Sequence, residues 1–140
     1  NLHIQPGEKV VDYRLLIKTI TELATRYDCM EHIYFSSEDP QIRMAAAEIA
    51  PTIERCLICQ KDGQFKNNLV ETARELNCKR IQTVEAYLTD SQIHAAKELG
   101  IRCNLYFTES LLEAKSWIDK GIDCILTDNF LSVSTELSKQ

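Results

Sequence analysis

Short apolar runs alternate along the chain with longer stretches in which apolar residues recur at a helical period. Runs of this length predict buried strands, and apolar residues spaced three or four apart predict helices. The predicted strands are residues 2–5, 32–36, 55–60, 80–84, 102–107 and 124–127. The predicted helices are residues 13–27, 40–50, 67–76, 89–100 and 110–121, with a short polar helix after Phe130. The sequence therefore predicts six consecutive βα units.

Several of the predicted helices have recognisable start and stop signals. The Asp39-Pro40 pair supplies an N-cap residue followed by proline at the first helical position. Residues 89–92 and 110–113 have the capping-box pattern, and a glycine ends each of these two helices. These signals support the alternation of strands and helices.

The first predicted helix, residues 13–27, carries an apolar stripe that we expect to face the core. Its members are Leu15, Leu16, Ile20, Leu23 and Tyr27.

Strict alternation of strands with helix-length connections predicts a parallel sheet in an α/β domain. Two architectures fit, an open doubly wound sheet and part of a (βα)8 barrel. A doubly wound nucleotide-binding sheet usually has a glycine-rich turn after its first strand, and none follows here. Six units that begin at Asn1, without a methionine, fit the last six units of a barrel whose first two are missing. We expect Asn1 to be the cut end of a longer protein.

Composition narrows the function classes further. The 140 residues suit one domain, and the net charge of −5 gives no basic field for nucleic acid or anionic lipid. The chain has no apolar run of the length that a membrane span needs. The six cysteines lie mostly in apolar strand-like runs, where cysteine packs as a small hydrophobe. Reduced thiols favour a reducing compartment, and hence the cytoplasm, as the location.

The first strand and a later one carry the candidate site residues. His3 and Gln5 share one face of the first strand because side chains alternate, and they precede a Pro-Gly turn at its carboxyl end. Tyr106 shares a face with Asn104 near the end of its own strand. Ligands of α/β folds bind at this end of the strands. The alternative is a hydrogen-bonded interior histidine and an ordinary packed aromatic residue.

Four other residues have side chains that could take part in catalysis or binding, but for most of them we favour a structural role. We expect His32 at the opposite, structural end of the sheet and His94 on a helix face. We expect Trp117 in the core and Asp128 as either a site carboxylate or a helix N-cap, with capping favoured.

Four stretches resemble the C-terminal part of the glycerophosphodiester phosphodiesterase family. Residues 1–6 resemble its Asn-Ile-Glu-Leu-Lys-Pro strand, and residues 33–40 its Ile-Leu-Ser-Ser-Phe-Asp-Pro turn. Residues 99–108 resemble its Gly-x-x-Val-x-Val-Trp-Thr-Val segment, and residues 120–128 its closing Gly-Val-Asp-Gly-Ile-Ile-Thr-Asp strand. The resemblance covers essentially the whole chain in the right order. It implies an α/β fold in the form of a partial (βα)8 barrel, residues 1–140 being its C-terminal part.

The resemblance also implies a function in lipid and glycerol metabolism. The family hydrolyses glycerophosphodiesters to glycerol 3-phosphate and an alcohol, with a divalent cation and two histidines. The motifs that carry those histidines and the Glu-x-Asp pair are absent here, so we expect no catalytic residue in this chain and no activity from it alone. His3 stands at the metal-ligand Glu position, Gln5 at the following Lys position and Tyr106 at the active-site Trp position.

These departures shape the expected site. His3 becomes the candidate metal ligand, and Gln5 and Tyr106 the candidate substrate-binding residues. The family implies Ca²⁺ or Mg²⁺, whereas an imidazole ligand favours Mn²⁺ or Zn²⁺. The alternative is a divergent, non-catalytic phosphodiester-binding or interaction domain. In either case the open edges of an incomplete barrel predict self-association.

Overall fold

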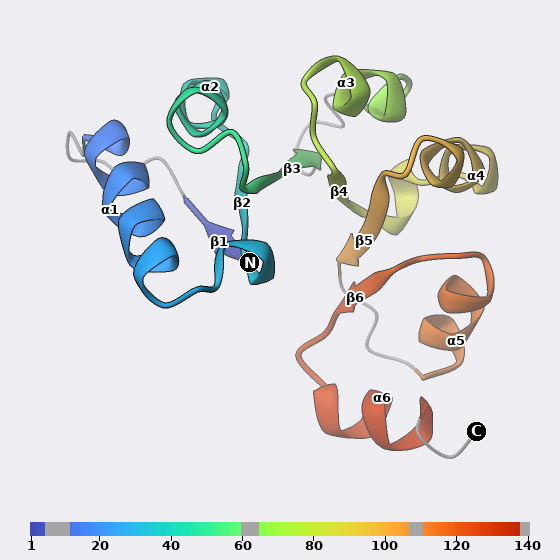
Figure 1. Cartoon of the computed structure of the whole chain (residues 1–140). Coiled ribbons are helices and arrows are strands. Elements are labelled where there is room, and N and C mark those ends of the chain that lie inside the picture. Colours follow the sequence, from blue (N-terminus) through green and yellow to red (C-terminus); the bar gives the residue numbers. More distant parts are fainter. Residues whose placement is uncertain (5–11, 60–64, 107–110, 138–140) are drawn as a thin grey trace. The chain divides into compact units, whose positions relative to one another are not determined.

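Strands and helices alternate along the whole chain in the computed structural model, which describes residues 1–4, 12–59, 65–106 and 111–137 (Figure 1). The strands are β1 (Leu2–His3), β2 (Tyr34–Ser37), β3 (Glu54–Cys59), β4 (Arg80–Val84), β5 (Arg102–Tyr106) and β6 (Cys124–Leu126). The α-helices are α1 (Tyr13–Arg26), α2 (Pro40–Ile49), α3 (Leu69–Glu75), α4 (Asp90–Glu98), α5 (Leu111–Asp119) and α6 (Phe130–Leu137). Two 3₁₀ helices, η1 (Met30–His32) and η2 (Glu85–Tyr87), precede β2 and follow β4. The six predicted βα units are confirmed.

Within each part of the chain the strands hydrogen-bond in chain order, β1–β2–β3 and β4–β5–β6. The β1–β2, β2–β3, β4–β5 and β5–β6 pairs are all parallel. A doubly wound sheet reverses its strand order at a switch point, whereas a (βα)8 barrel keeps the chain order. The fold is therefore a partial (βα)8 barrel, as predicted. The chain divides into two compact units, Asn1–Ile58 and Cys59–Gln140.

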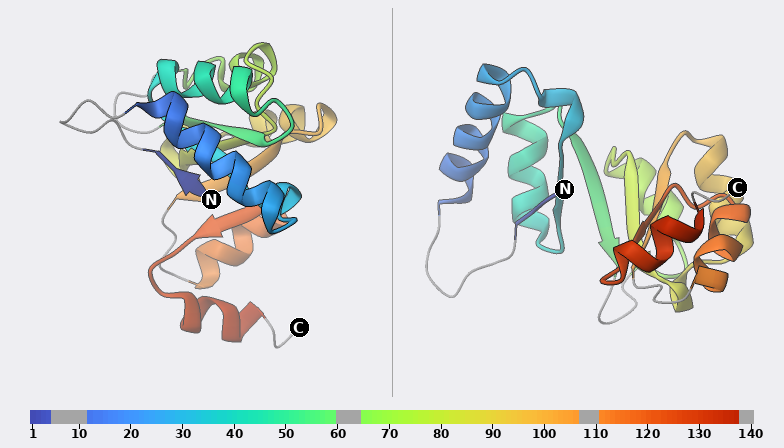
Figure 2. Two further views of the ribbon diagram at one scale, coloured as in Figure 1. Left: turned by 60° about the vertical axis from the view of Figure 1, so that its left-hand side comes forward. Right: turned by 90° about the horizontal axis from the view of Figure 1, so that it is seen from below.

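In the first unit, α1 and α2 pack together and against one face of the strands (Figure 2). Ile4 and Phe35 extend from β1 and β2 into a core that Ile17 of α1 and Ile42 of α2 complete. All four side chains are at least 94% buried. Leu2 packs against the same core, so Leu2 and Ile4 share the helix-covered face of β1.

The predicted apolar stripe of α1 is wrong in three of its five members. Leu15, Leu23 and Tyr27 are 60%, 45% and 72% exposed. The buried residues of α1 are Ile17 and Ala24, which lie seven positions apart and hence on one side of the helix. Leu16 and Ile20, the other two members of the predicted stripe, do pack against the core, so the buried face follows the helical period.

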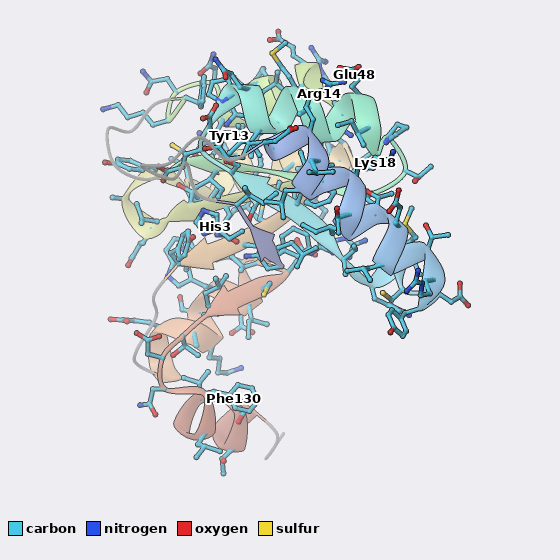
Figure 3. The ribbon with its side chains drawn as sticks, turned by 90° about the vertical axis from the view of Figure 1, so that its left-hand side faces the viewer. His3, Tyr13, Arg14, Lys18, Glu48 and Phe130 are labelled. Carbon is cyan, nitrogen blue, oxygen red and sulfur yellow. The ribbon has the colours of Figure 1, made fainter. Side chains whose placement is uncertain are left out.

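An exposed ion pair also joins α1 to α2 (Figure 3). The guanidinium of Arg14 donates to both carboxylate oxygens of Glu48, at 2.8 and 2.6 Å. These hydrogen bonds, with the opposite charge, lower the pKa of Glu48 and raise that of Arg14. A two-fold hydrogen bond of this kind fixes geometry, although exposure to solvent keeps its contribution to stability small.

The second unit buries one apolar face of β4, β5 and β6 beneath its helices. Ile81 of β4 pairs in register with Cys103 of β5, and Leu105 pairs with Ile125 of β6. Ile81, Leu105 and Ala96 of α4 are fully buried. Trp117 of α5 is 6% exposed, which confirms its predicted core position.

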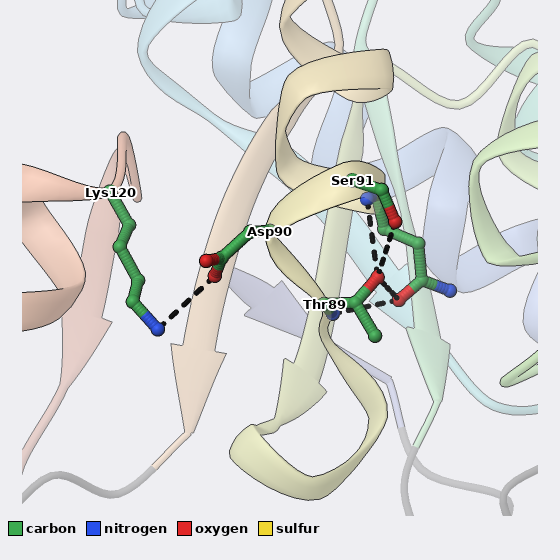
Figure 4. Close-up of polar contacts among 5 residues, drawn as sticks. Thr89, Asp90, Ser91 and Lys120 are labelled. Atoms are coloured by element: carbon green, nitrogen blue, oxygen red, sulfur yellow. Dashed lines mark hydrogen bonds and ion pairs between the residues drawn. The ribbon is translucent and has the colours of Figure 1, made fainter.

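The predicted helix boundaries can be compared with the hydrogen bonds at the helix ends. Asp39 Oδ1 accepts from the backbone N–H of Gln41, and Thr89 forms a complete capping box with Gln92 (Figure 4). Gly100 and Gly121 have φ values of +66° and +103°, the conformation that favours glycine after a helix. The predicted box at Ser110 lies outside the described residues.

Four boundaries or assignments differ from the prediction. Residues 30–32 form η1, so the second strand begins at Tyr34. Helix α3 begins at Leu69, two residues later than predicted. Asn129, rather than Asp128, precedes α6. The prediction that this helix is polar is wrong. Phe130 and Leu131 are exposed apolar residues, and Val133 is buried.

The cysteines pack mainly as predicted. No disulfide joins them, and Cys56, Cys59, Cys78 and Cys103 are buried. Cys29 is half-buried, and Cys124 lies exposed on β6. None of the helices within the described residues is long and apolar enough to cross a lipid bilayer.

Candidate functional site

His3 lies on the face of β1 opposite the helices of the first unit (Figure 3). Its neighbours Leu2 and Ile4 face the core, whereas the His3 side chain is exposed, so the predicted alternation is confirmed for these residues. His3 pairs in register with Ser36 of β2, and Ser36 pairs with Cys56 of β3. The backbone N–H of Ile4 donates to the carbonyl of Ser36 at 3.0 Å, which continues the β1–β2 pairing.

The turn that follows β2 is held by a dense set of hydrogen bonds. Arg43 Nη1 donates to the backbone carbonyls of Ser37 and Glu38, at 2.9 and 2.7 Å. The Ser37 hydroxyl accepts from the backbone N–H of Asp39 at 3.1 Å. A loop at the carboxyl end of a barrel strand is thus fixed by a residue one turn into the next helix. The sequence reasoning missed Arg43, and its position within α2 gave no signal of this role.

In the second unit, one face of the sheet carries two rows of side chains. Tyr106 ends β5 and pairs with Val84 of β4 and Leu126 of β6. All three are partly buried. Tyr106 therefore lies at the carboxyl end of its strand, on the face it shares with Asn104, as predicted.

The next row back from the carboxyl ends contains two carboxamides. Gln82 of β4 pairs in register with Asn104 of β5, and both side chains are fully buried. Neither Gln82 Nε2 nor Gln82 Oε1 has a hydrogen-bond partner among the described residues. A buried polar group without a partner costs about 1–3 kcal/mol, so two such atoms are unusual in a stable protein. The sequence reasoning missed Gln82, because Arg80 and Thr83 of the same strand are also polar and a glutamine between them gives no distinct signal.

A cavity of about 340 Å³ opens beside the residues that follow β4. Its polar lining includes Lys66, Asn67 and Ser91, with Tyr87 as an aromatic wall. Gln92 Nε2 donates to the backbone carbonyl of Lys66 at 2.8 Å and so connects the segment before α3 with the start of α4. Because η2 follows β4 directly, this cavity lies at the carboxyl end of that strand.

Polar contacts also link neighbouring helices of the second unit (Figure 4). Lys120 Nζ lies 3.1 Å from Asp90 Oδ1 and 4.4 Å from the centre of the Trp117 ring. The ammonium group therefore connects the end of α5 with the start of α4. These contacts are structural and contribute no candidate site.

The amino ends of β5 and β6 carry a different polar contact. Asp123 Oδ2 accepts from the backbone N–H of Cys103 at 2.7 Å, and the backbone N–H of Asp123 donates to the carbonyl of Cys103 at 2.9 Å. Burial, with the nearby Asp123 carboxylate as a second cause, raises the pKa of the Cys103 thiol from 9.0 to about 12. A thiol with such a pKa stays protonated and unreactive at neutral pH.

The described residues do not by themselves form a metal shell. No group of three or more His, Cys, Asp or Glu residues within them is arranged to hold an ion. His3 is exposed on β1 and supplies at most one ligand. A hard divalent cation takes six or more ligands, mostly oxygen atoms, so the residues described here do not fit it alone.

The remaining sequence predictions fall into three groups. Gln5 lies outside the described residues. The convergence of His3, Gln5 and Tyr106 stays a prediction, because His3 and Tyr106 belong to different units. His32 precedes β2, at the end of the sheet where it was predicted. His94 lies exposed on α4, near Glu98, as predicted for a residue on a helix face.

Comparison with known proteins adds evidence on the fold. No family model matches the sequence, and no curated protein matches it. Among solved structures, a glycerophosphodiester phosphodiesterase from Parabacteroides distasonis has a TM-score of 0.78 at 14% identity. The match covers 98% of this chain and 56% of that one. An Oleispira antarctica phosphodiesterase in complex with the product sn-glycerol-3-phosphate has a TM-score of 0.77 at 17% identity, covering 99% of this chain and 54% of that one.

A third structure, the glycerophosphodiester phosphodiesterase from Thermotoga maritima, has a TM-score of 0.64 at 16% identity. The match covers 99% of this chain and 57% of the Thermotoga chain. The chain has the fold of the glycerophosphodiester phosphodiesterases. It spans about half the length of the glycerophosphodiester phosphodiesterase structures that it matches. Identities of 14–17% establish this fold and leave the chemistry to be argued from the residues themselves.

Proposed function

We propose that these 140 residues are part of a glycerophosphodiester phosphodiesterase, an enzyme that hydrolyses glycerophosphodiesters to glycerol 3-phosphate and an alcohol. The observation that carries the proposal is the fold match over 98–99% of the chain, which includes a phosphodiesterase with bound sn-glycerol-3-phosphate. The location of Tyr106 at the carboxyl end of β5 supports it, because barrel enzymes bind their substrates at that end.

Within this proposal the chain contributes binding rather than proton transfer. Tyr106 would form an apolar wall of the substrate pocket, and Gln5 would offer a neutral amide where the related motif has a lysine. His3 would be one ligand of a divalent cation, which neutralises phosphoryl charge when it is bound. The other ligands and both catalytic histidines would come from residues beyond these 140.

Purified residues 1–140 are expected to release no glycerol 3-phosphate from glycerophosphodiesters, with or without added divalent cations. The physical reason is that the chain lacks the motifs that carry the two histidines expected as general base and general acid. An enzyme-coupled assay for glycerol 3-phosphate measures this directly. Metal-stimulated turnover by this chain would contradict the proposed division of roles.

Replacing His3 by glutamate is expected to raise the affinity of the complete polypeptide for Ca²⁺ or Mg²⁺ by about tenfold, since hard cations prefer carboxylate oxygen to imidazole nitrogen. Isothermal titration calorimetry on the variant and the unmodified protein checks the effect. His32→Glu is the matched control, because His32 lies in η1, before β2. Equal affinity for all three proteins would mean that His3 binds no metal.

The second candidate function is a non-catalytic domain that binds phosphodiesters. The observation that favours it is the combined replacement of Glu, Lys and Trp of the related motifs by His3, Gln5 and Tyr106. The complete polypeptide distinguishes the two functions. Metal-dependent release of glycerol 3-phosphate supports the enzyme, whereas binding of a glycerophosphodiester without turnover supports the binding domain.

A further inference from the structure

We propose that Gln82 binds a hydroxyl group of a polyol ligand, such as the glycerol part of glycerol 3-phosphate. This inference rests on the proposed function and specifies which part of the ligand the second unit recognises. It starts from the Gln82 carboxamide, which is fully buried in β4 and has no hydrogen-bond partner for either polar atom among the described residues. Buried polar groups in native proteins are normally hydrogen-bonded, so this amide requires a partner.

The position of Gln82 connects it with the carboxyl ends of the strands. Val84 and Tyr106 form the row nearest those ends, and Gln82 and Asn104 form the next row on the same face. Two residues along a strand correspond to about 7 Å, roughly the length of a three-carbon polyol. A polyol with one end at the Gln82 amide would therefore have its other end at the row of Tyr106, which is partly buried.

The chemistry of this row favours a neutral hydroxyl group over a phosphate. A carboxamide offers an acceptor oxygen beside two N–H donors, and a pair of adjacent hydroxyl groups presents the complementary set. Phosphate recognition instead relies on cationic side chains or clustered backbone N–H groups. The cations on this face, Arg80 and Arg102, stand at the amino ends of β4 and β5, one row farther from the carboxyl ends.

The test compares residues 1–140 with the variants Gln82→Met and Gln41→Met in thermal unfolding. Gln41 is an exposed glutamine on α2 and serves as the matched control. Without ligand, Gln82→Met is expected to raise Tm by a few degrees, because methionine fills a similar volume without leaving polar atoms unsatisfied. Sn-glycerol 3-phosphate at ten times its Kd is expected to raise Tm of the unmodified chain and of Gln41→Met by about 5 °C.

The same ligand is expected to leave Tm of Gln82→Met nearly unchanged. An equal ligand-induced rise in Gln82→Met and in the unmodified chain would overturn this inference and leave the proposed function standing. No rise in any of the three proteins would also overturn the inference. The release of glycerol 3-phosphate by the complete polypeptide tests the proposed function separately.

An independent measurement follows the Gln82 side-chain NH₂ resonances of the unmodified chain by NMR. They are expected to shift on addition of sn-glycerol 3-phosphate and of glycerol, but not of inorganic phosphate. This readout remains decisive if Gln82→Met folds poorly. Resonances that stay unchanged with sn-glycerol 3-phosphate would show that Gln82 is satisfied inside the protein, for instance by a buried water molecule.

Discussion

Raising the pH from about 8 to about 11 is expected to lower the free energy of unfolding by about 3 kcal/mol through the Cys103 thiol alone. The pKa of this thiol is raised from 9.0 to about 12 in the folded protein, by burial and by Asp123. Between these two values the unfolded chain loses the proton and the folded protein keeps it. The stability that the buried neutral thiol provides is therefore complete below about pH 9 and is lost as the pH rises towards 12.

Urea unfolding at several pH values, for the unmodified chain and for Cys103→Ala, isolates this effect. The alanine variant is less stable at pH 8 because it loses a buried side chain, but its stability should fall less steeply with pH. Lysines, tyrosines and the other cysteines titrate in both proteins and cancel in the comparison. Parallel curves for the two proteins would contradict the prediction.

Replacing Leu105 by alanine is expected to destabilise the protein by about 2–5 kcal/mol, the range for removing a fully buried leucine side chain. Leu105 lies in β5 between β4 and β6, pairs with Thr83 and Ile125, and is completely buried. Both neighbouring strands restrict how far the surroundings can close around the cavity. The midpoint of urea unfolding, followed by circular dichroism, measures the loss.

Leu99→Ala is the matched control for this experiment. Leu99 is the C-cap residue that follows α4 and is 45% exposed, so the same change of side chain should cost less than about 1 kcal/mol there. Equal losses in the two variants would mean that β5 is not the packed centre of the second unit.

The sequence predicted the order and type of the elements because strand-length apolar runs and capping residues are local signals. Asp39 and Thr89 cap their helices as their positions in the sequence indicate. The buried side of α1 also follows the helical period, because Leu16, Ile20 and Ala24 lie on the same side of the helix as Ile17. The prediction chose the wrong face because the large apolar residues Leu15 and Leu23 lie outside it.

The candidate site was predictable only in part. The alternation of side chains placed His3 opposite the core and Tyr106 at a strand end, as the structure has them. Gln82 escaped notice because Arg80 and Thr83 of β4 are polar as well, and a glutamine in such a strand resembles a solvent-facing residue. Only the combination of full burial, register with Asn104 and missing partners distinguishes it.

The pairing of each strand with its neighbour in the chain has a consequence for synthesis in the cell. Register partners such as Phe35 and Arg55, or Ile81 and Cys103, are separated by about 20 residues, so contacts within each unit are local. Ribosomes add about 5–20 residues per second, and domains fold as units in the order in which they emerge. The second strand of each of these pairs is therefore synthesised only about 1–4 seconds after the first. The first unit can fold while the second is still being translated.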